Sequence, residues 1–148
     1  MESGYKKLAT AITINAIIMF FLTYVLMSSI GHFHVNINRI YMALIMAAPM
    51  AIVMLIVMRS MFMNKRLNNL LFITFGALTI LLFFLMRAQV PVGNVQFLRS
   101  MIPHHSSAIL MCEQAAITDP EIAELCDQII QSQEEEIAQM EAMLERYR

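Results

Sequence analysis

The stretch AILMCEQAAITDPEIAELCDQII, residues 108–130, contains the turn that decides the fold of the C-terminal part of the chain. Apolar residues recur at helical spacing before this turn and again after it. Thr118 or Asp119 can cap the second helix, and Pro120 suits a first helical turn, where no backbone N–H is needed. The pattern predicts an antiparallel hairpin of two helices, roughly 24 and 27 residues long, with Asn94 capping the first.

A pair of histidines lies inside the apolar pattern of the first helix. When successive residues are placed about 100° apart, His104 and His105 fall on the two sides of the line through Met101 and Ala108. Pro103 precedes the pair and lacks a backbone N–H, so it leaves a nearby carbonyl without its helical partner. Because buried polar groups need hydrogen bonds or a bound ligand, we expect both histidines to belong to a site.

The second helix carries polar residues at a matching level. Gln133 and Glu136 interrupt its apolar arc. A turn centred near residue 119 places the histidine pair opposite Gln133 and Glu134, and it places Cys112 opposite Cys126. Three states of these cysteines stay open: a disulfide that closes the hairpin, two reduced thiols, or an additional metal ligand.

Three membrane spans precede the hairpin. Hydrophobic residues make up 59% of the 148 residues and charged residues only 14%, a composition that indicates membrane spans. Apolar runs at residues 8–30, 40–58 and 70–90 are each long enough to cross a bilayer, which needs roughly 20 residues. We therefore expect an all-α protein, with a three-helix transmembrane domain at residues 1–90 and a soluble hairpin at residues 91–148.

Charge is distributed unevenly along the chain. Residues 1–90 contain seven Lys or Arg and one Glu, whereas residues 91–148 contain three Lys or Arg and ten Asp or Glu. Basic residues gather before the first span and between the second and third, which predicts a cytoplasmic N-terminus and a hairpin on the outer side. In a bacterium this means the inner membrane, with the hairpin in the periplasm. The acidic hairpin argues against nucleic acid as a partner.

Methionines recur every fourth residue along the second span, at Met42, Met46, Met50, Met54 and Met58. Thioethers are soft ligands that suit Cu(I), and this spacing resembles that of the three-span copper transporters of the Ctr type. The third span contains only one glycine and lacks the Gly-x-x-x-Gly pattern of that family. We interpret the methionine ladder as flexible apolar filler in a packed helix, with a copper-transport path as the alternative.

The segment MIPHHSSAILMCEQA, followed by DPEIAELCDQIIQSQEEEIAQMEAML, resembles the domain-of-unknown-function 305 (DUF305) family. The resemblance covers residues 94 to about 147 and rests on Met, His-His and Met on one helix, then Gln, Glu-Ile and Met on the next. It implies a ferritin-like helical bundle, and some family members are periplasmic copper-binding proteins. The site residues that it implies are Met101, His104, His105, Met111, Gln133, Glu136 and Met140.

The single hairpin has a consequence for assembly. Members of that family commonly contain two such hairpins, whereas this chain contains one. A two-helix hairpin with polar groups in its apolar arc buries little core, so we expect two copies to form a four-helix bundle. The chain is thus predicted to be a homodimer or a higher homo-oligomer in the lipid bilayer.

Imidazole and thioether ligands together predict a membrane-anchored protein that binds a copper ion and acts in copper homeostasis. The alternatives are a membrane-anchored oligomerisation module without metal and a copper-transport component that uses the methionine ladder. We do not expect an enzyme, because no nucleophile stands beside a matching base. The His-Phe-His sequence at residues 32–34 is interpreted as an interfacial turn, with a second metal-binding point as the alternative.

Overall fold

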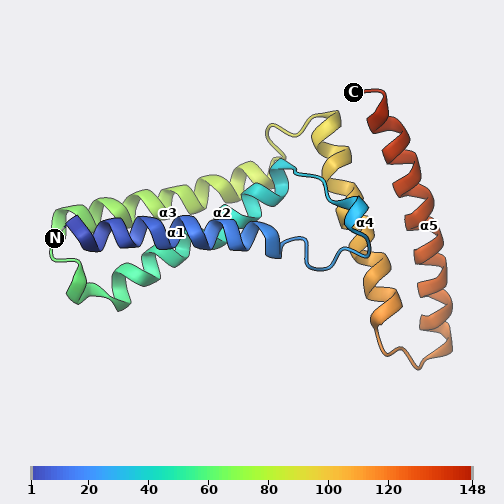
Figure 1. Cartoon of the computed structure of the whole chain (residues 1–148), viewed down its shortest axis with the longest axis horizontal. Coiled ribbons are helices and arrows are strands. Elements are labelled where there is room, and N and C mark those ends of the chain that lie inside the picture. The colour runs from blue at the N-terminus through green and yellow to red at the C-terminus, as the bar shows by residue number, and fades with distance from the viewer. Residues whose placement is uncertain (1, 148) are drawn as a thin grey trace. The chain divides into compact units, whose positions relative to one another are not determined.

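The computed structural model describes residues 2–147 and contains only helices within that range (Figure 1). The α-helices are α1 (Glu2–Leu22), α2 (Ile37–Val57), α3 (Lys65–Arg87), α4 (Asn94–Gln114) and α5 (Pro120–Glu145), and two short 3-10 helices are η1 (Ile30–His32) and η2 (Arg59–Met61). The predicted all-α fold is confirmed.

The chain divides into two compact units. The membrane unit comprises the described residues up to Thr23 together with Asn38–Pro91, and it contains α1, α2 and α3. Its helices include three segments that are long and apolar enough to cross a membrane: Gly4–Leu22, Ile37–Val57 and Lys65–Arg87. The hairpin unit comprises Tyr24–Ile37 and the described residues from Val92 onward. The loop 24–37 thus belongs with the hairpin, although it lies between two spans in the sequence.

The first span ends earlier than its apolar pattern predicts. The predicted run extends to residue 30, but α1 stops at Leu22 and the chain turns. The Tyr24 hydroxyl, in a side chain that is 6% exposed, donates a hydrogen bond of 2.8 Å to the His34 carbonyl. Tertiary contacts within the loop therefore prevail over a local sequence that is apolar enough to continue the helix.

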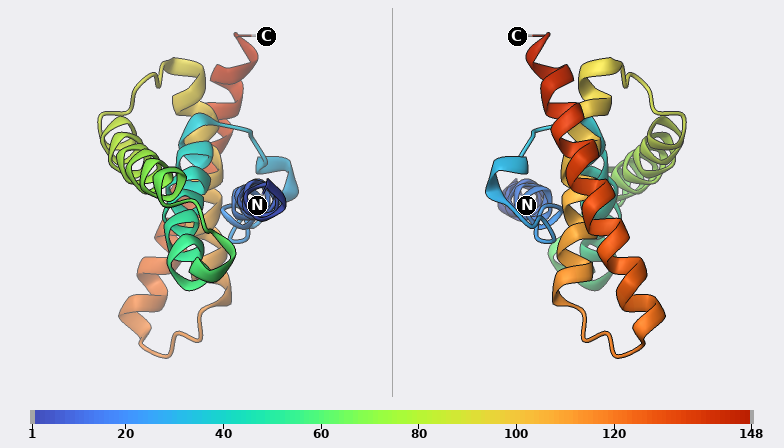
Figure 2. Two further views of the ribbon diagram at one scale, coloured as in Figure 1. Left: turned by 90° about the vertical axis from the view of Figure 1, so that its left-hand side faces the viewer. Right: turned by 90° about the vertical axis from the view of Figure 1, so that its right-hand side faces the viewer.

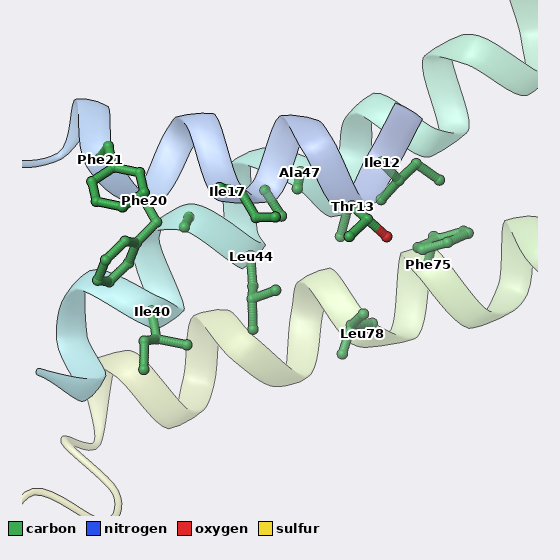
Figure 3. Close-up of a pocket in the computed structure, with 13 residues that line it drawn as sticks. Ile12, Thr13, Ile17, Phe20, Phe21, Ile40, Leu44, Ala47, Phe75 and Leu78 are labelled. Atoms are coloured by element: carbon green, nitrogen blue, oxygen red, sulfur yellow. The ribbon is translucent and has the colours of Figure 1, made fainter. Parts of the chain in front are cut away.

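The membrane unit contains an apolar pocket between its helices. Figure 3 shows this pocket, about 580 Å³ in volume, lined by residues of α1, α2 and α3 such as Ile17, Leu44 and Leu78. The buried positions of α2 are mostly alanine, whereas Met46 and Met50 are 42% and 45% exposed. Met58 is exposed as well, whereas Met54 packs against the buried cluster that contains Leu55. Both interpretations of the methionine ladder stay predictions.

The hairpin unit is built around α4 and α5, which lie side by side (Figure 2). Leu98, Ile102 and Ile109 of α4 pack against apolar residues of α5, and together they form the core. The buried residues contributed by α5 are Ile137, Met140 and Leu144. This core confirms the predicted antiparallel hairpin, with helices of 21 and 26 residues.

Of the N-caps predicted for the two hairpin helices, the structure confirms that of α5 but not that of α4. Asp119 caps α5, since its side chain accepts hydrogen bonds from the backbone N–H groups of Glu121 and Ile122. Pro120 occupies the first turn, as predicted. The N-cap of α4 is Gly93 rather than Asn94. The Asn94 side chain instead donates to the Tyr147 hydroxyl.

Pro103 leaves a backbone acceptor of α4 free, and the loop 24–37 donates a hydrogen bond to that acceptor. Helix α4 continues through Pro103, whose missing N–H deprives the Arg99 carbonyl of its i+4 donor. The Asn36 amide replaces that donor with a hydrogen bond of 3.1 Å, and Asn36 is only 1% exposed. One turn earlier, the Gln96 side chain accepts from the Ile37 N–H at 3.0 Å. The proline thus creates an acceptor that the loop uses.

This explanation predicts a coupling between two substitutions. Asn36→Ala should destabilise the protein by about 1–3 kcal/mol, because it removes the buried amide that donates to the Arg99 and His34 carbonyls. In a Pro103→Ala background the added backbone N–H can donate to the Arg99 carbonyl, so Asn36→Ala should cost less there. Thermal unfolding of the four variants in detergent measures the difference, and equal costs in both backgrounds would contradict the explanation.

Candidate metal centre

His105 lies at the edge of the hairpin core with one ring nitrogen committed to the backbone. His105 is 7% exposed, and its Nδ1 lies 3.0 Å from the Met101 carbonyl oxygen. A carbonyl can only accept, so Nδ1 carries a hydrogen and donates it. The remaining nitrogen, Nε2, is therefore the position that can bind a ligand or a proton.

Glu136 occupies the position in front of that nitrogen. Its Oε2 lies 2.6 Å from His105 Nε2. An unprotonated Nε2 and an ionised carboxylate are both acceptors, and two acceptors do not approach this closely without a cation between them. One proton must therefore be shared by the pair, on the imidazole or on the carboxyl group.

The same two groups could bind a metal ion in place of the proton once the Glu136 carboxylate moved back, because each ligand atom must lie about 2 Å from the ion. Histidines that bind metals usually donate their other N–H to a carbonyl or carboxylate, which orients the ring. His105 has this arrangement through the Met101 carbonyl. The Glu136 side chain is 52% exposed, so an ion can reach the pair from solvent. The two groups can act as a nitrogen and an oxygen ligand.

Three other predicted residues lie near this pair. Met140 is buried in the hairpin core, and Met101 is half-buried and packs against that core. Gln133 on α5 is half-buried. The hydrogen bond between His105 and Glu136 is the contact that brings a polar residue of each helix together at this level. The partner of His105 is Glu136, whereas the register from the turn placed Gln133 or Glu134 there.

His104 and Met111 are placed differently from the prediction. His104 is exposed, and Met111 is 60% exposed. The packed face of α4 runs along Leu98, Ile102 and Ile109, about 90° around the helix from the predicted line. His105 stays inside this rotated face and His104 leaves it. Among the residues that the structure describes, no group of three or more His, Cys, Asp or Glu side chains could hold a metal ion.

The second side of α4 is covered by the loop 24–37, which the sequence did not assign to the hairpin. The Oγ of Ser106, a residue with no exposed surface, accepts from the Ser28 N–H at 2.9 Å. The same atom lies 3.0 Å from Ser28 Oγ and 2.9 Å from His32 Nδ1. His32 therefore packs on the hairpin through Ser106, which follows His105 in the sequence but faces another side of the helix.

A groove of about 390 Å³ lies on that second side. Its polar lining comes from Ser28, Ser29 and His32 of the loop and from Glu113, Glu134 and Glu141 of the hairpin. The signal that could have revealed it is the polar pair Ser28-Ser29 in an otherwise apolar run, since a membrane helix has little reason to hold both.

Cys112 and Cys126 face each other across the hairpin, as the register predicts. Both are free thiols, and each is half-buried. A hydrogen bond with Cys126, together with burial, raises the pKa of Cys112 from 9.0 to about 11. The structure therefore places two thiols in contact, and a disulfide between them stays a prediction.

The raised pKa predicts slow alkylation of Cys112. Iodoacetamide reacts with the thiolate, so the rate at Cys112 should reach half its maximum near pH 11. Cys126→Ala removes the hydrogen bond and should move this midpoint toward 9.0. Since the fold favours the neutral thiol, its contribution to stability is complete below pH 9.0 and disappears as the pH rises through 11. An unchanged midpoint in Cys126→Ala would contradict the assignment.

Comparisons with known proteins identify the family of the chain. Residues 82–144 match the family model described as domain of unknown function (DUF305). The chain is also similar to "Uncharacterized protein L153" of Acanthamoeba polyphaga mimivirus, with 33% identity over 120 residues, which is 80% of this chain and 77% of the viral protein. No solved structure matches. The chain therefore belongs to the same family as this viral protein, and its C-terminal part is a DUF305 domain.

Proposed function

We propose that the protein is a membrane-anchored copper-binding protein that holds the ion at His105 and Glu136. The observation that carries the proposal is the hydrogen-bond pattern of His105. Its Nδ1–H is committed to a carbonyl, and its Nε2 faces a carboxylate oxygen at 2.6 Å. A metal ion in place of the shared proton would satisfy both groups, and binding would then release that proton.

The surrounding side chains favour copper over other ions. Imidazole nitrogen suits copper, and the nearby thioethers of Met101 and Met140 are soft ligands that Mg²⁺ and Ca²⁺ do not use. A di-iron centre needs several Glu residues and Glu-x-x-His motifs on facing helices, and the sequence has no such motif. Gln133, His104 and Met111 are proposed as further ligands that would approach the ion after rearrangement or from another chain.

The proposed role is binding and homeostasis rather than catalysis. Three helices that are long and apolar enough to span a membrane would anchor the hairpin to the bilayer. The distribution of Lys and Arg supports an orientation with the hairpin on the outer side, which in a bacterium is the periplasm. There the hairpin would meet copper ions before they reach the cytoplasm.

Copper titration of the purified full chain tests the proposal. We expect stoichiometric binding that Glu136→Gln weakens at least about tenfold, which corresponds to about 1.4 kcal/mol. His105→Ala should abolish it. The neighbouring Glu135→Gln is the matched control, because Glu135 is exposed and contacts Gln131 instead. Calorimetry in two buffers of different ionisation enthalpy should show that the wild type releases a proton on binding.

Two outcomes would count against this assignment. If Glu136→Gln and Glu135→Gln bind copper as tightly as the wild type, the ion is held elsewhere. If the wild type binds no transition metal, the hairpin is better explained as an oligomerisation module without metal.

The orientation can be tested separately by labelling. In a variant without native cysteines (Cys112→Ser with Cys126→Ser), Glu124→Cys on α5 should react with a membrane-impermeant maleimide from outside. Ser60→Cys, in the basic segment before α3, should react only after the membrane is permeabilised. The reverse pattern would place the hairpin in the cytoplasm.

A further inference from the structure

The hairpin has two long sides, and within the described residues of the hairpin unit the loop 24–37 covers one of them. Ala138 lines the groove under the loop 24–37 together with Glu113 of α4, so this side of both helices faces the loop. Glu136 and Ala138 flank the core residue Ile137, so they lie about 100° to either side of it. Glu136 is therefore on the side that the loop leaves uncovered, which we call the open face.

The open face is apolar along both helices. On α4 it carries Phe97 and Met111, which are 51% and 60% exposed. On α5 it carries Ile122, Leu125 and Met143, which are 51%, 53% and 41% exposed. Large apolar side chains gathered on one side of a hairpin usually mark a surface that another protein covers.

Ionisable groups interrupt this apolar surface near its middle. His104, which is exposed, projects from α4, and Glu136 projects from α5. Two copies related by a two-fold axis would bring the His104 of each toward the Glu136 of the other. The open face is thus complementary to itself in charge and apolar at both ends, which favours a second copy of this chain as its partner.

The metal candidate is also incomplete within one chain. His105 and Glu136 are one nitrogen and one oxygen ligand, and no third His, Cys, Asp or Glu joins them among the described residues. Two copies that pair through their open faces would supply two nitrogen ligands and two oxygen ligands. Four nitrogen and oxygen ligands form the tetragonal set that Cu(II) prefers.

We propose that two copies pair through their open faces and that one copper ion is shared by the two His105–Glu136 pairs at the seam. The shared ion rests on the proposed function, whereas the pairing of open faces does not. The loop 24–37 blocks the opposite side of α4, so the four-helix bundle forms on this side only.

Cross-linking of the full chain in detergent or nanodiscs tests the pairing. In the background without native cysteines, Ala108→Cys lies on the open face and should give a covalent dimer with a short bis-maleimide. Glu124→Cys, on the outer side of α5, should stay monomeric. Leu125→Glu should reduce the dimer fraction in sedimentation at least about tenfold, whereas Gln128→Glu should leave it unchanged.

Metal stoichiometry separates this inference from the function on which it rests. The wild type should bind one copper ion per two chains, and Leu125→Glu should lose tight binding together with the dimer. One ion per chain in a monomer that resists cross-linking would overturn the pairing and leave copper binding intact. A dimer through the open face that binds no copper would support the pairing and overturn the proposed function.

Discussion

Helix α4 is packed on two sides, and the rest of the hairpin unit depends on this constraint. Helix α5 covers one side through the apolar core, and the loop 24–37 covers another through Ser106 and the Arg99 carbonyl. With both sides occupied, the helix cannot rotate without breaking buried hydrogen bonds. The rotation decides which of two adjacent histidines enters the interior, and it places His105 there.

Pro103 explains why the loop 24–37 is attached to α4 at this place. A proline inside a helix normally weakens it by removing one hydrogen bond. Here the vacated acceptor is filled by Asn36 from a segment 63 residues earlier in the chain. The result is a specific attachment between the loop and α4, rather than the flexible tether that a short connection between two spans would provide.

The chemistry of the candidate centre follows from unequal burial of its two groups. His105 is held in the interior with a fixed ring orientation, and Glu136 is half-exposed at the surface. In the proposed copper site, an oriented imidazole beside an exposed carboxylate would let an ion enter from solvent. Met140 is buried in the core and Met101 packs against it, so in the proposed copper site these soft thioethers would be near the ion without blocking its access from solvent.

The sequence by itself predicted the helices, the turn, a cap at Thr118 or Asp119, and the facing positions of Cys112 and Cys126. These features follow from periodicity and from contacts over short separations, which residue spacing encodes directly. It did not reveal that the first span stops at Leu22, because the run to residue 30 is apolar enough to continue.

Only the tertiary structure decided the rotation of α4, the exposure of His104 and the role of the loop 24–37. A helical wheel identifies a single apolar arc, so it cannot show that a second segment also packs against the same helix. The loop covers Ser106 and the Arg99 carbonyl on another side of α4. The register of the packed helices brings Glu136, rather than Gln133, to His105.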